Sequence, residues 1–234
     1  MNQDSNTGLS VRYLLTVQGQ PEELEVFVTS VRHPTDGDKL FQPSRAVPVP
    51  AGLEAVDPFA IPYYHFIQNQ YRMAAEALEA LNEEPNLVAL LKDPAKHQEA
   101  RVLLNRTLDT EALAGVALVR KNVRQYNALT RAQWAQKNWG QFDDRLTCAQ
   151  FERVTNRRGQ YHFTWHTLDV RILDQLGALH PTLAFGLVGV DELNLKQAYG
   201  WHCEGSSTFH HGAGAVDPGR PTWLDHLPAA FSVA

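Results

Sequence analysis

Two kinds of hydrophobic periodicity divide the chain, and together they restrict the folds that it can adopt. Strand-like alternation marks both ends, whereas helical spacing marks the middle. Residues 10–18 alternate, with Val11, Tyr13, Leu15 and Val17 on one side, and residues 24–31 are β-branched and also alternate. Residues 18–21 (Gln-Gly-Gln-Pro) resemble a turn, so the pattern predicts an N-terminal antiparallel β-hairpin.

The middle of the chain is predicted to be helical. After Pro62, a favourable first helical residue, apolar residues recur three to four apart: Ile67, Tyr71, Ala74, Leu78 and Leu81. Two short helices, residues 86–92 and 95–107, are separated by Asp93-Pro94. Asp109 or Thr110 caps a long basic helix that we expect to run to Trp139, with Gly140 as its stop.

The last part mixes strand and helix. Residues 151–155 and 160–166 predict a second hairpin, 168–178 a short helix and 182–190 a buried strand, followed from Tyr199 by an irregular tail. The fold class is therefore α+β. We expect three segments: residues 1–60, a hairpin plus a proline-rich arm over 34–62; 61–140, helical; and 141–234, mixed, which forms one compact unit with 61–140.

Charge is distributed unevenly along this acidic chain. The formal net charge is −5, yet residues 112–160 hold nine Lys/Arg against three Asp/Glu, and no acid lies between Glu111 and Asp143. Residues 1–111 hold nine Lys/Arg against sixteen acids. Such asymmetry indicates an anionic partner or a complementary subunit.

The basic residues predict an anion-binding surface. Arg120, Arg124, Asn127 and Arg131 share one face if the helix is continuous, and Lys121 lies beside them. Arg157 and Arg158 are expected at the exposed tip of the second hairpin, and Trp134 or Trp139 would stack on bases. The alternatives are an ordinary solvated basic face, pairing with the acidic residues 76–84, and a contact with another subunit.

Seven of the ten histidines lie after residue 160, which raises the question of a metal site. The candidate ligands of a divalent metal ion are His202, Cys203, His210 and His211, although their spacing matches no established metal motif. On a strand His162 and His166 would lie about 13 Å apart, so both cannot bind one metal ion. The alternatives are scattered structural histidines and metal-free acid–base chemistry, with Asp169 or Asp174 orienting a histidine.

The segment Arg158–His166 (RGQYHFTWH) loosely resembles the Trp-His segment of HNH-type toxin nucleases over nine residues. Thr167 stands where that segment carries a second histidine. The resemblance implies one divalent metal ion and a histidine general base, for which His166 and His162 are the candidates.

Two functions remain open on the sequence, which leaves unsettled whether the chain is an enzyme. The first is a nucleic-acid-associated protein, in its fullest form a metal-dependent nuclease that uses the C-terminal histidines. The second is a non-catalytic assembly subunit, of a phage particle or a multiprotein complex, that docks through the proline-rich arm and residues 212–234. The polar start and the short apolar stretches predict no membrane partner and a cytoplasmic or virion-associated location.

Overall fold

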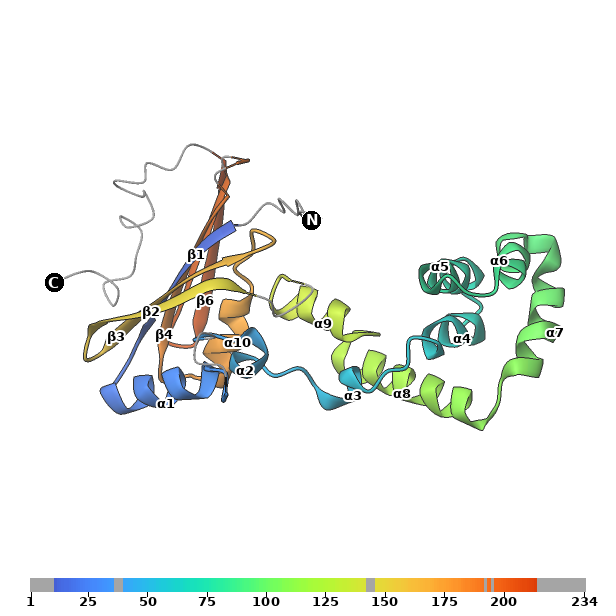
Figure 1. Cartoon of the computed structure of the whole chain (residues 1–234), viewed down its shortest axis with the longest axis horizontal. Helices are drawn as coiled ribbons and strands as arrows, with labels where there is room; N and C mark the ends of the chain where they lie inside the picture. Colours follow the sequence, from blue (N-terminus) through green and yellow to red (C-terminus); the bar gives the residue numbers. More distant parts are fainter. Residues whose placement is uncertain (1–10, 36–39, 142–145, 192, 195, 214–234) are drawn as a thin grey trace, which may run out of the picture. The chain divides into compact units, whose positions relative to one another are not determined.

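The computed structural model of the chain describes residues 11–35, 40–141, 146–191, 193–194 and 196–213. They fall into two compact units, one formed by residues 1–48 and 135–234 and the other by residues 49–134. The α+β class is confirmed, with an antiparallel sheet in the first unit and helices in the second (Figure 1). Among the described residues, no helix has the length and apolar character needed to cross a membrane.

The first unit is built on a six-stranded sheet in which neighbouring strands are antiparallel. The strands are β1 (Val11–Gln18), β2 (Thr147–Thr155), β3 (Arg158–Trp165), β4 (Ala184–Asp191), β5 (Lys196–Cys203) and β6 (Ser206–Ala213). Their order is β2-β3-β1-β4-β5-β6. With helices α1 (Pro21–Val31) and α10 (Ile172–Leu179), the first four strands give the β-α-β-β-α-β succession of a ferredoxin-like, split βαβ fold. The β5–β6 hairpin extends this sheet at one edge.

The strand predicted for residues 24–31 is wrong, because this segment is helix α1. Its buried residues, Leu24, Phe27, Val28 and Val31, follow a helical spacing, and Val26 is 68% exposed. Pro21 lies in the first turn with Glu22 and Glu23, where a missing N–H and negative charge both suit a helix N-terminus. Strand β1 itself is confirmed, but its partners are β3 and β4.

Helices α1 and α10 pack on the same face of the sheet, here called the proximal face. Phe27 of α1 contacts Tyr161 and Phe185 edge to face, and the β-carbon position of Gly177 in α10 is 2.2 Å from the His202 ring. The alternation predicted for β3 is confirmed, with Tyr161, Phe163 and Trp165 buried on this face. The predicted hairpin β2–β3 and the buried strand β4 are confirmed as well.

The prediction of an irregular segment from Tyr199 is wrong as far as Ala213. Strands β5 and β6 pair without a register break from Lys196–Ala213 to Cys203–Ser206. The turn between them places Glu204 and Gly205 at positive φ, which closes a two-residue hairpin. Residues 212 and 213 of the predicted docking tail belong to β6, and its residues 214–234 lie outside the described residues.

The second unit is helical. Its helices are α3 (Ala51–Glu54), α4 (Ala60–Ile67), α5 (Tyr71–Leu81), α6 (Pro85–Lys92), η1 (Pro94–Lys96), α7 (His97–Thr107) and α8 (Thr110–Tyr126), and α9 (Arg131–Asn138) begins in it. The two short helices predicted around Asp93-Pro94 are therefore confirmed. The apolar stripe predicted from Ile67 to Leu81 is divided, because Asn69 adopts a left-handed conformation between α4 and α5.

The proline-rich segment 34–62 is more ordered than the predicted arm. It contains α2 (Pro43–Ala46) in the first unit and α3 in the second, and it contributes buried side chains to both. Phe41 stacks on Phe163 with ring centroids 5.5 Å apart, and Leu53 is 2% exposed. These residues are anchored in their own units, and the docking role of the segment stays a prediction.

Candidate nucleic-acid interface

Helix α8 carries the predicted cations on an exposed face. Its N-terminus is capped as expected, because the Asp109 carboxylate accepts a hydrogen bond from the Ala112 backbone N–H at 2.8 Å. Val116, Val119 and Asn122 are buried against the rest of the unit. On the other side Ala117, Arg120, Lys121, Arg124 and Gln125 line a shallow hollow of about 330 Å³ along the helix. We call Arg120, Lys121 and Arg124 the α8 cations.

The predicted stripe is wrong at its C-terminal end. Helix α8 stops at Tyr126, where Asn127 adopts a left-handed conformation with φ 51° and its N–H bonds to the Val123 carbonyl. Arg131 begins the next helix, and its Nε lies 3.8 Å from Glu54. Because Asn127 breaks the helix, Asn127 and Arg131 do not extend the basic face, and Lys121 takes their place beside Arg120 and Arg124.

Among the described side chains, the α8 cations form no ion pair with an acidic residue. Arg120 and Arg124 are four residues apart, a spacing at which like charges destabilise an isolated helix by about 0.2–0.5 kcal/mol. Arg124 recovers part of this cost, because it lies in the last turn near the negative end of the helix dipole. The arrangement suits an external anion better than an internal partner.

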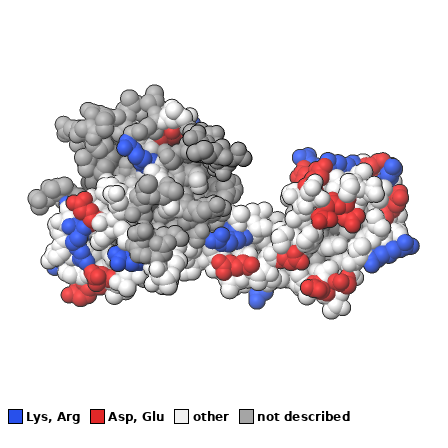
Figure 2. Space-filling view, viewed as in Figure 1, with Lys and Arg blue, Asp and Glu red and all other residues white. Residues whose placement is uncertain are grey.

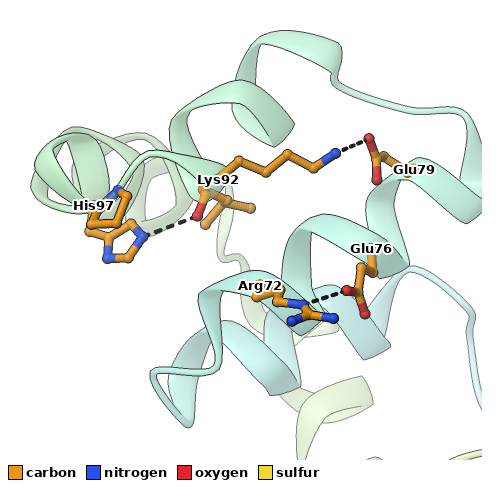
Figure 3. A pocket seen from close by; sticks show the side chains of 7 residues that line it. Arg72, Glu76, Glu79, Lys92 and His97 are labelled. Atoms are coloured by element: carbon orange, nitrogen blue, oxygen red, sulfur yellow. Dashed lines mark hydrogen bonds and ion pairs between the residues drawn. The ribbon is translucent and has the colours of Figure 1, made fainter.

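A second hollow in the helical unit has a different character (Figure 3). It measures about 420 Å³ and is lined by residues of α5 to α7, including Leu91 and Pro94. Its cations are already paired, because Arg72 lies 2.8 Å from Glu76 and Lys92 lies 2.5 Å from Glu79. Figure 2 likewise shows acidic and basic side chains interspersed over this unit. The hollow on α8, by contrast, is lined by three cations that form no ion pair among the described residues.

The two hairpin arginines differ in their surroundings. Arg157 is exposed in the turn between β2 and β3, as predicted, and its carbonyl accepts a bond from the Gly19 N–H at 3.0 Å. Arg158 belongs to β3 and is half-buried, so its placement at the exposed tip is wrong. Its Nε is buried and has no hydrogen-bond partner among the described residues.

The two tryptophans predicted to stack on bases are in the hydrophobic cores of their units. Trp134 is 7% exposed and Trp139 is fully buried. The Trp139 indole N–H donates to the Val47 carbonyl at 3.2 Å. Neither ring is available to a ligand in this arrangement, so that prediction is wrong.

The sheet instead presents other aromatic rings on its second face, which points away from α1 and α10 and is here called the distal face. Tyr199 lies on this face because it pairs with Val188, which shares the face with Leu14. His210 lies opposite Tyr199, and Trp201 is two residues further along β5, so all three rings share the distal face. Their rings are nearly parallel, with interplanar angles of 16–27°. The sequence pattern did not reveal Tyr199 and Trp201, because it predicts an irregular segment from Tyr199 onward, whereas both residues belong to β5.

The predicted metal ligands are divided between the two faces. His202 is buried on the proximal face, and its Nδ1 lies 2.8 Å from the Ser207 hydroxyl. Cys203 and His210 lie on the distal face, because side chains alternate along a strand. His211 is exposed and pairs with Ala198, which is four residues before His202 on β5. Among the described residues, no group of three or more His, Cys, Asp or Glu side chains is arranged to hold one metal ion. The divalent metal stays a prediction.

The predicted catalytic histidines lie on and just beyond β3. His162 is exposed on the distal face opposite Leu14, and His166 is exposed after the strand ends. Asp169, a proposed orienting partner, is engaged by Arg171, whose guanidinium lies 2.6 Å from its carboxylate. The catalytic roles of His162 and His166 stay predictions.

Known proteins similar to this chain are few and distant. No protein-family profile matches the chain, and no curated protein matches it. Among solved structures, it is similar to the crystal structure of a protein api92 from Yersinia pseudotuberculosis, described with family DUF1281, at 10% identity and a TM-score of 0.40. That alignment covers 88% of this chain and 98% of the other.

Proposed function

We propose that this protein binds nucleic acid and that the α8 cations contact its phosphates. The observation that supports this most directly is the exposed, acid-free basic face of α8 in a chain whose net charge is −5. Three cations within two helical turns match a phosphate backbone, whereas a solvated helix face of an acidic protein normally mixes both signs.

Salt dependence tests the proposal. The affinity of a fluorescently labelled single-stranded oligonucleotide is measured by anisotropy over a series of salt concentrations. Each phosphate contact to a single strand contributes about −0.7 to the slope of log K against log salt, so the three α8 cations together contribute about −2. We expect the variant R120Q/K121Q/R124Q to lose that part of the slope and to bind weakly at low salt.

A matched control separates the site from net charge. The variant R72Q/K92Q/R101Q removes the same charge from the same unit, but at cations that already have partners within the protein. It should keep the wild-type slope to within about half a contact. Equal losses in both variants, or no binding by the wild type at low salt, would contradict the proposal.

Phosphodiester hydrolysis is the more demanding form of the same proposal. It requires a divalent metal ion and a histidine general base, for which His162 and His166 are the candidates on the sequence. Cleavage of an end-labelled oligonucleotide in Mg²⁺, Mn²⁺ or Zn²⁺, compared with a chelator, tests it. Binding without cleavage in the presence of any of the three metals would reject the nuclease and keep the nucleic-acid-binding protein. A defined oligomer that binds no oligonucleotide would favour the assembly subunit.

A further inference from the structure

We infer that the distal face of the sheet binds the unpaired bases of a single-stranded nucleic acid, with Tyr199, Trp201 and His210 as the stacking residues. The inference rests on the proposed function for the kind of ligand. The proposed stacking site lies in the first unit, whereas α8 lies in the second. The sheet would contact bases, and α8 would contact phosphates.

The ring cluster carries the argument. Tyr199 and Trp201 are two residues apart on β5, with centroids 6.4 Å apart and planes within 16°. His210 on β6 lies 4.9 Å from Tyr199 and 5.4 Å from Trp201, also nearly parallel. Rings held in a common orientation on adjacent strands suit planar bases, since every base has a π face that stacks on an aromatic side chain.

The rings lie among both polar and apolar side chains, and buried Val188 is opposite Tyr199. On the same face the Gln160 amide lies 3.4 Å from the Thr16 hydroxyl, and Gly186 lies opposite Trp201 without a side chain to cover it. An amide and a hydroxyl offer the donors and acceptors that read base edges. The proximal face, by contrast, is filled with buried apolar residues.

Charge on this face favours a polyanion as the occupant. Within the described strands, the distal face carries Arg12, Arg158 and one acid, Glu152 of β2, which lies opposite Gln160. The buried Arg158 Nε without a hydrogen-bond partner is a second observation that points to a missing acceptor. A face with two arginines and one glutamate, in a chain whose net charge is −5, fits a phosphate-bearing strand better than an acidic partner.

Oligonucleotides with and without bases test the inference. The probes are DNA and RNA strands of about 12 nucleotides, an abasic strand of equal charge, and a duplex. We expect the wild type to bind the strands with bases about 5- to 150-fold more tightly than the abasic strand, the range that base–aromatic stacking produces. Trp201→Ala should remove most of this difference, and Trp201→Phe should restore part of it.

Two further variants protect the test from misfolding and from nonspecific effects. His210→Ala changes an exposed side chain, so it should fold normally and still weaken binding of the strands with bases. Phe59→Ala removes an exposed ring from the helical unit and should change nothing. Circular dichroism and the thermal midpoint establish that each variant is folded.

The outcomes separate this inference from the proposed function. Equal affinity for abasic strands and strands with bases would overturn the stacking site alone. Loss of binding to every probe would overturn both proposals. A changed molecular mass of Trp201→Ala in analytical ultracentrifugation, with unchanged oligonucleotide affinity, would assign the face to a second copy of the chain and also overturn the inference.

Discussion

The side-chain amide of Asn122 donates a hydrogen bond of 2.7 Å to the carbonyl oxygen of Gly52, seventy residues earlier in the chain. Asn122 is 1% exposed on the inner side of α8, and a β-carbon on Gly52 would lie 2.8 Å from its Oδ1. This hydrogen bond connects α3 to α8, the helix that carries the α8 cations. The basic face is therefore supported by a buried polar contact directly beneath it.

Asn122→Ala should lower the free energy of unfolding by about 1–3 kcal/mol, because the Gly52 carbonyl would lose its buried donor. Urea unfolding followed by circular dichroism measures the change. Asn105→Ala, at an exposed position of α7, should stay within about 0.5 kcal/mol of the wild type. Equal effects of the two substitutions would refute a role for the Asn122–Gly52 bond.

Gly177→Ala should destabilise the first unit although alanine favours helices. The new β-carbon would lie 2.2 Å from ring atoms of His202, which is buried and held by Ser207. Overpacking of this kind costs about 1–3 kcal/mol, more than the gain in helix propensity of about 1 kcal/mol. In the background His202→Ala, the same change should become neutral or stabilising, and a double-mutant cycle measures the difference.

Lowering the pH should destabilise the native state through His180. Its ring packs edge to face on Phe27 with centroids 5.0 Å apart, and burial lowers its pKa from the ordinary 6.5. The unfolded chain therefore takes up the proton first as the pH falls. The stability that the neutral, packed His180 ring contributes is fully present above pH 6.5 and is lost as the pH falls towards the folded-state pKa. Urea unfolding at pH 7, 6 and 5 should show a shallower decline in His180→Gln than in the control His162→Gln.

Tyr13→Phe should loosen the chain that follows β3. The Tyr13 hydroxyl donates to the Thr167 carbonyl at 2.5 Å and accepts from the Asp169 N–H at 2.7 Å, and burial raises the pKa of this phenol. Losing both bonds should cost about 1–3 kcal/mol and speed amide exchange at Asp169. Tyr63→Phe, which removes an exposed hydroxyl, should leave both measurements unchanged.

Sequence patterns predicted elements best where one periodicity had no competitor. In β3, aromatic and polar residues alternate strictly, and the buried Tyr161, Phe163 and Trp165 follow that pattern. Residues 24–31 fit both periods, and only Pro21 followed by two glutamates favours the helix. The α8 cations were found from composition, but the end of their helix depended on Asn127 adopting a left-handed conformation, which asparagine tolerates without requiring it.

The distal face could not be predicted, because it depends on pairing between strands far apart in sequence. His162 and His210 were singled out as chemical groups, yet their shared face follows from the register of β3, β1, β4, β5 and β6. The tryptophans closest to the basic helix were the natural candidates for stacking. Which of the four described tryptophans faces outward is decided by tertiary packing and not by local pattern.

The position of β1 has a consequence for how the protein is made. This strand is synthesised well before its partners β3 and β4, and Val11 lies opposite Trp165. At synthesis rates of about 5–20 residues per second, β1 waits on the order of ten seconds or more with both edges unpaired. The helical unit, whose contacts are local, can fold during that interval. Chaperone dependence during translation should therefore arise from strand β1.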